Sequence, residues 1–432
     1  MPTFYAHSTD RDDRLDWQPL REHLEGVAKL AKKLAIATGV PSLPEAAEAA
    51  GWLHDLGKYQ LNWQKYLLAS AAGLKPKTVP HSIHGAAYAL REFGHCPLVI
   101  AIAGHHTGLQ DWDDGNKIET TEQASAEVIE GLVATAKAEC SSFPTTVASP
   151  EFEDSHNGAR RLEYWTRMLF SSLIDADRLD TAGRGRLDSP LDPKRLLGIL
   201  REKAPKPKAD TDGQLNNLRR QVFEECVTAG KQPRGFFELT VPTGGGKTRS
   251  GMAFALSHAE KHDLRRVFVV IPYLSIIEQN ARDYRTVFGE GVVLEHHSAV
   301  VPDDQKPPPS EPYRSKAPAE LAAENWDAPI IVTTSVQFLE TLLAASTRRC
   351  RRLHSVARSV IVFDEAQCLP THILNSLMDV FRELVSNYGC SVVFSTATQP
   401  AFRHSPLGLT HGLKENERQS ICLLYTSDAA DE

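Results

Sequence analysis

The sequence lacks any apolar run long enough to cross a membrane as a helix. The longest nearly unbroken run, VFVVIPYLSII at 267–277, falls far short of the roughly 20 residues that a membrane helix needs. The first residues, MPTFYAHSTDRDDR, also lack the apolar core of a signal peptide. We therefore expect no membrane partner.

Paired cysteines and an excess of positive charge are missing as well. The seven cysteines are scattered and form no CxxC pair, which argues against a zinc ribbon and against a disulfide framework. We therefore expect a cytoplasmic location, where thiols stay reduced. The formal net charge is −7, so the molecule as a whole presents no basic field to nucleic acid. Any contact with nucleic acid must come from local patches or from backbone amides.

What the sequence does contain is two halves with different apolar patterns. A chain of 432 residues exceeds one ordinary domain. Before residue 200, apolar residues recur at helical spacing, as at Leu24, Val27 and Leu34, which predicts an all-helical domain. Later, short β-forming runs such as RRVFVVI and SVIVFD alternate with helical patterns. This alternation is typical of a mostly parallel sheet covered by helices.

A segment without large apolar side chains, which cannot contribute to a hydrophobic core, separates the two halves. KAPKPKADTDG, at 203–213, combines proline, lysine and aspartate and is typical of a linker. We predict a helical domain at 1–202, the linker at 203–213 and an α/β domain at 214–415. The chain ends in CLLYTSDAADE, which shows no packing pattern, so we expect 416–432 to be a truncated or artefactual tail.

The second half contains a candidate phosphate-binding loop. VPTGGGKT, at 241–248, lies between the strand-forming FFELTV and a helical segment, as such a loop requires. Glycine N–H groups can hold phosphates at the helix start, Lys247 can reach the β and γ phosphates, and the Thr248 hydroxyl can hold Mg²⁺. Val241 replaces the first glycine of the strict pattern, and a glycine-rich turn without ligand is the alternative. The predicted loop residues are Thr243, Gly244, Gly245, Gly246, Lys247 and Thr248.

An acidic pair follows a predicted strand further along. SVIVF ends in Asp364 and Glu365, and an acid at the carboxyl end of such a strand can bind Mg²⁺ while the next orients the attacking water. A solvated loop is the alternative for an isolated pair. We assign Asp364, Glu365 and Gln367 to the ATP and Mg²⁺ site, with Glu365 also catalytic.

Five segments occur in the order of the motifs of superfamily 2 helicases. VPTGGGKT, IPYLSIIEQNA, IVTTSVQF, FDEAQ and STATQP fill much of 241–400 and together resemble motifs I, Ia, Ic, II and III. The resemblance implies ATP as a ligand and contacts with a nucleic-acid backbone from Pro272, Tyr273, Thr333 and Thr334. It also implies residues that couple ATP hydrolysis to strand movement, namely Ser395, Thr396 and Thr398.

Two features of this half have alternative interpretations. By the helicase resemblance, Gln221 reads the adenine base, and an ordinary helix surface is the alternative. The arginine run RRCRRLH, at 348–354, contacts phosphates in one interpretation and forms a solvated face in the other. The solvated face is the usual outcome for such a charge run.

The first half carries histidines beside acids. His23 lies in an amphipathic helical pattern, HDLGK begins at His54, HSIHGA begins at His81, and GHH ends at His106. The two acids are Asp55, in HDLGK, and Asp177, at the end of SSLIDAD. One such histidine is usually an ordinary core or surface residue, but four histidine segments and two acids supply donors for one or two transition-metal ions. Asp55 can bridge two ions that activate a water against a phosphodiester. Lys58, one helical turn later, can neutralise phosphate charge.

The adjacent His-Asp pair resembles the HD phosphohydrolase superfamily. HDxGK, HSxxGA, GHH and a terminal AD before a superfamily 2 motor are similar to the CRISPR-associated helicase-nuclease of type I interference systems, from about residue 15 to 410. This resemblance implies an all-α HD domain, a RecA-like P-loop domain, and catalytic roles for Asp55 and Lys58. His84 stands where that family usually has a small residue, and we do not assign it. The implied metal ligands are His23, His54, Asp55, His81, His105, His106 and Asp177.

The resemblance also implies a function. Members of the family cut and unwind the DNA strand displaced when a guide-RNA surveillance complex opens its target. We therefore expect a metal-dependent single-stranded DNA endonuclease coupled to an ATP-dependent helicase, with that complex as partner. The expected cofactors are ATP, Mg²⁺ and two divalent transition-metal ions, with Fe, Mn, Co and Ni as candidates. No second RecA-like lobe follows STATQP, so we expect weak ATP binding without processive unwinding.

Two functions from other classes fit parts of the same pattern. In one, the first domain hydrolyses nucleotides or cyclic dinucleotides and is fused to an unrelated ATPase. In the other, the first domain holds no competent metal pair and the protein is an ATP-dependent nucleic-acid clamp.

Overall fold

The computed structural model of the chain divides into two compact units. One, here called the helical unit, comprises Met1–Arg186 and Ala344–His354; the other, the sheet unit, comprises Leu187–Leu343 and Ser355–Glu432. The residues that the structure describes are 3–9, 14–111, 125–140, 142–148, 150, 158–183, 190–203, 212–242, 244–297, 318–396, 402–406 and 408–422.

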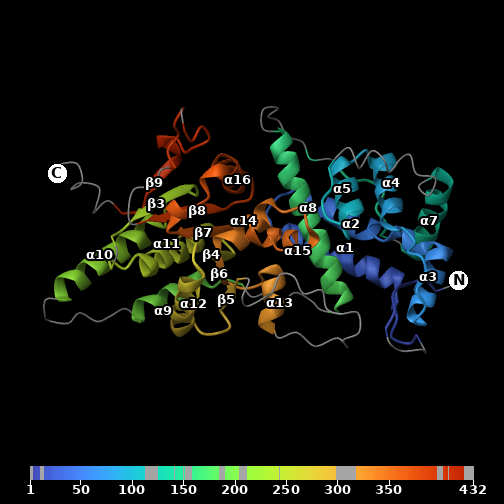
Figure 1. Cartoon of the computed structure of the whole chain (residues 1–432), viewed down its shortest axis with the longest axis horizontal. Helices are drawn as coiled ribbons and strands as arrows, with labels where there is room; N and C mark the ends of the chain where they lie inside the picture. The colour runs from blue at the N-terminus through green and yellow to red at the C-terminus, as the bar shows by residue number, and fades with distance from the viewer. Residues whose placement is uncertain are drawn as a thin grey trace. The chain divides into compact units, whose positions relative to one another are not determined.

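The helical unit is built around three helices. α1 (Leu20–Ile36), α2 (Leu43–Leu53) and α8 (Gly158–Thr181) pack on one another, as Figure 1 shows. Their apolar residues recur every three or four positions, so each helix buries one stripe. The remaining elements are β1 (Tyr5–His7), β2 (Gln18–Pro19), η1 (Leu56–Tyr59), α3 (Leu61–Ala71), α4 (Ser82–Phe93), α5 (Cys96–Gly104), α7 (Ala126–Glu139) and α15 (Thr347–Cys350).

A segment from the second half of the sequence completes this unit. Residues 344–354 pack on α8, where Arg351 Nε lies 2.6 Å from Oδ1 of Asp175. Ser171 Oγ lies 3.0 Å from Nδ1 of His354. Arg351 and Arg352 are 6% and 4% exposed, so a solvated face is the wrong interpretation for this part of the arginine run. The charge is buried because a buried carboxylate on α8 needs a cationic partner.

The sheet unit contains a sheet of seven parallel strands in the order β5-β6-β4-β7-β8-β3-β9. β4, β7 and β8 are almost wholly buried, which explains their continuous apolar sequences. The strands are β3 (Phe236–Thr240), β4 (Arg266–Ile271), β5 (Val293–His296), β6 (Ile330–Thr334), β7 (Ser359–Asp364), β8 (Ser391–Thr396) and β9 (Arg418–Ser420). The fold class predicted from the sequence, a helical domain followed by a RecA-like domain with a mostly parallel sheet, is confirmed.

Helices connect the strands of this sheet (Figure 1). The α-helices are α9 (Pro193–Glu202), α10 (Asp212–Ala229), α11 (Lys247–His262), α12 (Leu274–Phe288), α13 (Pro318–Asn325), α14 (Ser335–Leu343) and α16 (Leu374–Asn387). Shorter 3-10 turns are η4 (Leu353–Val356), η5 (Ala366–Cys368), η6 (Thr371–Ile373) and η7 (Glu415–Glu417). No helix in the described ranges is both long enough and apolar enough to cross a membrane.

The folded lobe continues beyond residue 415. β9 pairs with β3, and Ile421 and Cys422 are buried in the core of the sheet unit, so ordered structure extends into the segment predicted as a tail. Its remainder, 423–432, and most of the predicted linker, 204–211, lie outside the described residues.

The close approach of α4 to the end of α2 generates a first prediction. A Cβ at Gly85 would overlap the carbonyl oxygen of Leu53, so we expect Gly85→Ala to lower the free energy of unfolding by about 1–3 kcal/mol. Gly131→Ala is the matched control, because that helical position has open space around it and should gain about 0.5–1 kcal/mol. Urea denaturation followed by circular dichroism measures both, and equal stabilities would contradict the prediction.

The Arg351–Asp175 pair generates a second prediction. Arg351→Ala leaves the Asp175 carboxylate, which is 0% exposed, without this guanidinium and should cost about 3–5 kcal/mol. Adding Asp175→Asn removes the buried negative charge that Arg351 neutralises, so the double variant should lose less than the sum of the two single variants. The control is Lys29→Ala, which breaks an exposed pair with Glu25 and should change stability by less than about 0.5 kcal/mol. Strict additivity of the two single variants in urea denaturation would refute the pairing.

Candidate metal centre and nucleotide site

Helix ends deliver several of the candidate ligands. His54 and His105 directly follow the last residues of α2 and α5, and His81 directly precedes α4. Asp55 lies in the turn between α2 and η1, with φ −113° and ψ 18°. The HDLGK segment is therefore a helix end followed by a 3-10 turn, and this break from regular helix lets consecutive side chains point into one site.

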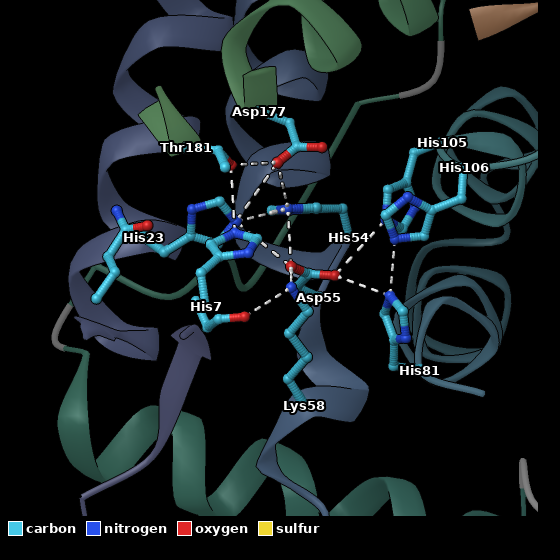
Figure 2. A network of polar contacts seen from close by, with 12 residues as sticks. His7, His23, His54, Asp55, Lys58, His81, His105, His106, Asp177 and Thr181 are labelled. Atoms are coloured by element: carbon cyan, nitrogen blue, oxygen red, sulfur yellow. Dashed lines mark hydrogen bonds and ion pairs between the residues drawn. The ribbon is translucent and has the colours of Figure 1, made fainter. Parts of the chain in front are cut away.

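Asp55 lies at the centre of the cluster, with one oxygen toward each of two histidine groups (Figure 2). Its Oδ2 is 3.3 Å from His23 Nε2 and 3.4 Å from His54 Nε2. Its Oδ1 is 3.3 Å from His81 Nε2 and 3.6 Å from His105 Nε2. Oδ1 forms no hydrogen bond within the described part of the chain although it is buried. A carboxylate placed in this way can bridge two cations.

The other two predicted ligands join one group each. Asp177, on α8, places Oδ1 3.6 Å from His23 Nε2 and 3.8 Å from His54 Nε2. His106 places Nε2 2.9 Å from Nε2 of His81. The structure thus brings all seven predicted ligand residues together. The first ligand group is His23, His54 and Asp177, and the second ligand group is His81, His105 and His106.

Hydrogen bonds orient the imidazole rings toward the centre of the cluster. His54 Nδ1 lies 2.8 Å from the carbonyl oxygen of Gly51, and His105 Nδ1 lies 2.7 Å from that of Ile102. A carbonyl only accepts, so Nδ1 carries the proton in both rings and Nε2 turns a lone pair inward. This is the usual arrangement of histidines that bind metals.

The electrostatics of the first ligand group favour a bound cation. His23 Nε2 and His54 Nε2 are 3.2 Å apart, and two lone pairs at that distance repel unless a proton or a cation lies between them. Burial lowers the pKa of His23, but the hydrogen bond from its Nδ1 to Asp180 and the contact with Asp55 outweigh burial and raise that pKa to about 9. A divalent ion can replace such a proton. The donor set therefore fits divalent metal ions.

Lys58 and the two acids balance the charge of the cluster. Lys58 Nζ lies 2.6 Å from Asp55 Oδ2 and donates to the carbonyl oxygen of Ala6 at 3.2 Å. Burial alone would raise the pKa of Asp55, but Lys58 and His54 hold it well below its usual range. For Asp177, burial is likewise outweighed by His54 and His23, which lower the pKa of that carboxyl. Both acids are therefore carboxylates that can bind cations.

Three residues near the cluster were missed by the sequence analysis. Asp180, one helical turn after Asp177, accepts from His23 Nδ1, and its spacing on α8 could have predicted this position. His7 lies beside His23 at the end of β1, and a lone histidine in a short segment carries no such signal. Burial, with Lys58 and His23, lowers the pKa of His7 to about 3. Thr181 Oγ1 lies 3.2 Å from His7 Nε2.

The phosphate-binding loop begins α11 in the sheet unit. Gly244 and Gly246 have φ of 84° and 85°. Residues with a side chain rarely adopt such backbone angles, so glycine is favoured at both positions. Lys247 Nζ lies 3.3 Å from Asp364 Oδ1 and also pairs with Glu365. Burial raises the pKa of Glu365, but the bond from Lys247 outweighs it, so the net effect is a lowered pKa. The lysine thus occupies the position next to the acids where phosphate and Mg²⁺ would lie.

Further predicted residues surround this pair. Gln367 Nε2 donates to Glu365 at 2.7 Å, and Ser395 Oγ donates to Asp364 Oδ1 at 3.5 Å. Thr248 is exposed at the start of α11, Gly245 is buried and Thr396 is buried at the end of β8. Thr243 and Thr398 lie outside the described residues.

The helix α10 also reaches the loop. Gln221 contacts Glu225 of the same helix at 3.5 Å and stays a predicted adenine-reading residue. Arg219, which the sequence analysis did not single out, donates from Nε to the carbonyl oxygen of Gly244 at 2.8 Å. This bond ties α10 to the phosphate-binding loop.

The predicted nucleic-acid residues differ in exposure. Tyr273 is 51% exposed and Pro272 is half-buried. Thr334 is 6% exposed and its Oγ1 accepts from the backbone of Gln337, while Thr333 is 0% exposed. Burial of both hydroxyls argues against direct side-chain contact with a bound strand in this conformation. Of these four residues, Tyr273 is exposed enough for its side chain to contact a bound strand directly.

Two family descriptions match the chain. The family model described as HD domain matches residues 20–136, and the model described as DEAD/DEAH box helicase matches residues 218–404. The CRISPR-associated nuclease/helicase Cas3 of Haloferax volcanii is 26% identical over 220 residues, which are 46% of this chain and 24% of that protein. The chain therefore spans about a quarter of the length of this curated relative.

Solved structures share the fold. T. fusca Cas3 matches with a TM-score of 0.57 and 17% identity, covering 91% of this chain and 50% of that one. A chain in a CRISPR RNA-guided surveillance complex, pre-nicking, matches with a TM-score of 0.54 and 17% identity, over 92% of this chain and 48% of that one. The chain described here joins an HD domain to a DEAD/DEAH box helicase domain, an arrangement consistent with a Cas3-type fusion.

Proposed function

We propose that the protein is a metal-dependent single-stranded DNA endonuclease fused to an ATP-driven helicase motor, acting in type I CRISPR interference. The observation that carries the nuclease proposal is the position of Asp55 between two pairs of histidines. His23 and His54 lie within 4 Å of its Oδ2, and His81 and His105 lie within 4 Å of its Oδ1. Seven nitrogen and oxygen donors converge there, whereas a structural site would need four for one ion.

The residues of the cluster would have different roles in phosphodiester hydrolysis. Two divalent ions, when bound, would polarise the phosphodiester and lower the pKa of a water. Asp55 would be the carboxylate shared by both ions, held with the histidines of the two ligand groups and Asp177. Lys58 would fix the Asp55 carboxylate and contribute positive charge near the phosphate. Nitrogen-rich ligation favours Fe, Mn, Co or Ni over Mg²⁺.

The sheet unit supplies the candidate motor. Lys247 and the N–H groups of the glycine loop would bind the ATP phosphates at the start of α11. Asp364 would bind Mg²⁺, and Glu365 would orient the attacking water. Ser395 contacts Asp364, which supports a role in coupling hydrolysis to movement of the strand.

The names of two similar proteins support the proposed substrate, single-stranded DNA of an opened target. One is named as a CRISPR-associated nuclease/helicase and another lies in a surveillance complex before nicking. We infer that this chain acts on the displaced strand of an opened target. Base recognition by the protein is then unnecessary, because the guide supplies the sequence information.

The metal site predicts a specific loss of nuclease activity. With Mn²⁺, Co²⁺, Ni²⁺ or Fe²⁺, the full chain should linearise and degrade circular single-stranded DNA. Asp55→Asn, which is similar in size but weakens the bridge between the ions, should reduce the cleavage rate at least about 100-fold. Removing the metal with EDTA should abolish cleavage, and adding it back should restore the wild type. The matched control is His372→Ala, an exposed histidine outside the cluster.

Cleavage that is equal in wild type and Asp55→Asn with every metal would refute the nuclease proposal. A parallel panel of nucleoside phosphates and cyclic dinucleotides tests the phosphohydrolase alternative. Metal-dependent turnover of these compounds, with circular DNA left intact, would replace the proposal by that alternative.

The phosphate-binding loop generates the next prediction. Lys247→Ala removes the ammonium group beside Asp364 and Glu365 and should lower DNA-stimulated ATP hydrolysis at least about 100-fold. Cleavage of circular single-stranded DNA without ATP should be unchanged, because Lys247 belongs to the sheet unit. Lys231→Ala, an exposed lysine of the same unit, is the control. ATP hydrolysis that survives Lys247→Ala would place the nucleotide elsewhere.

A further inference from the structure

His7 lies in a segment whose backbone is fixed by its neighbours. β1 pairs antiparallel with β2, and the Tyr5 backbone forms two hydrogen bonds with the Gln64 side chain, at 3.1 and 3.0 Å. Lys58 donates to the carbonyl oxygen of Ala6. These contacts hold His7 at the rim of the histidine cluster without using its own side chain.

The His7 imidazole turns toward the first ligand group (Figure 2). Its ring packs edge-on against that of His23, with centroids 4.8 Å apart and an interplanar angle of 88°. Donor atoms of His7, His23 and Asp177 all lie within 4.8 Å of one another. Metal–ligand bonds near 2.1 Å separate ligand atoms around one ion by about 3 to 4 Å. Small side-chain rotations would therefore place these three donors on one ion.

We propose that His7 is a further metal ligand, joining His23, His54, Asp55 and Asp177 around one of the two ions. The inference rests on the two-ion site of the proposed function and adds an eighth residue to it. His7 is half-buried, whereas His23, His54 and Asp55 are at most 1% exposed. The added ligand would therefore lie at the more open edge of the site. A third imidazole there would favour a first-row transition-metal ion over Mg²⁺.

A purely structural role for His7 is the competing explanation, because its Nε2 contacts Thr181 Oγ1 at 3.2 Å. Thr181 Oγ1 in turn lies 3.5 Å from Asp177 Oδ1. Thr181→Val removes this hydroxyl contact but keeps the imidazole. The two explanations therefore predict different behaviour for Thr181→Val and His7→Ala.

The test measures binding of Co²⁺ alone to the full chain by titration calorimetry and by its visible absorption spectrum. Wild type and His372→Ala should bind two ions. His7→Ala should weaken one of them at least about tenfold and change the absorption bands, whereas Thr181→Val should keep the wild-type bands. Thermal melting of the metal-free proteins checks the fold, and His7→Gln, which retains a polar side chain, replaces His7→Ala if the latter unfolds.

The Co²⁺ measurements distinguish a metal-ligand role of His7 from a structural one. Unchanged Co²⁺ affinity and absorption in His7→Ala and His7→Gln would overturn the ligand assignment and leave the two-ion site intact. Equal changes in His7→Ala and Thr181→Val would also overturn it, in favour of the structural role. A wild type that binds no Co²⁺ would overturn the proposed function and, with it, the assignment of His7.

Discussion

A buried carboxylate, Asp55, is the constraint on which the helical unit depends. Asp55 is 1% exposed, and an ionised carboxyl at that depth is stable only when surrounded by cations or donors. One lysine and four imidazoles lie within 4 Å of its oxygens. These groups come from α1, the end of α2, η1, the start of α4 and the end of α5. The contacts that stabilise the Asp55 carboxylate therefore also link these elements of the helical unit to one another.

A second buried acid explains why part of the later sequence belongs to this unit. Asp175 lies on α8, two residues before Asp177, and its carboxylate pairs with Arg351. The segment 344–354 that carries Arg351 lies between α14 and β7 in the sequence, and both of those elements belong to the sheet unit. The chain thus leaves the sheet unit, contributes a charged partner to α8 and returns to the strand that ends in Asp364. The helix α8, which carries the predicted ligand Asp177, is thereby stabilised by a segment that precedes β7 in the sequence.

In the sheet unit the constraint is the parallel arrangement of the strands. Carboxyl ends of parallel strands meet at one edge, so the loop after β3, the acids at the end of β7 and the hydroxyl at the end of β8 converge there. Lys247, Asp364 and Ser395 are consequently in contact although 148 residues separate the first from the last. Glu365, whose φ of 48° is left-handed, also pairs with Lys247.

The sequence by itself determined the two classes of fold and predicted the phosphate-binding loop and the residue types of a metal centre, because periodicity and motif spacing are local properties. It could not determine which side chains line the histidine cluster beyond the known motifs. His7 reaches the cluster through the pairing of β1 with β2, and the partner of Asp175 is 176 residues away. The solvated-face interpretation was wrong for Arg351 and Arg352, which are buried, for the same reason. Only the tertiary structure decides such contacts, since burial of a charge depends on which distant segment supplies its partner.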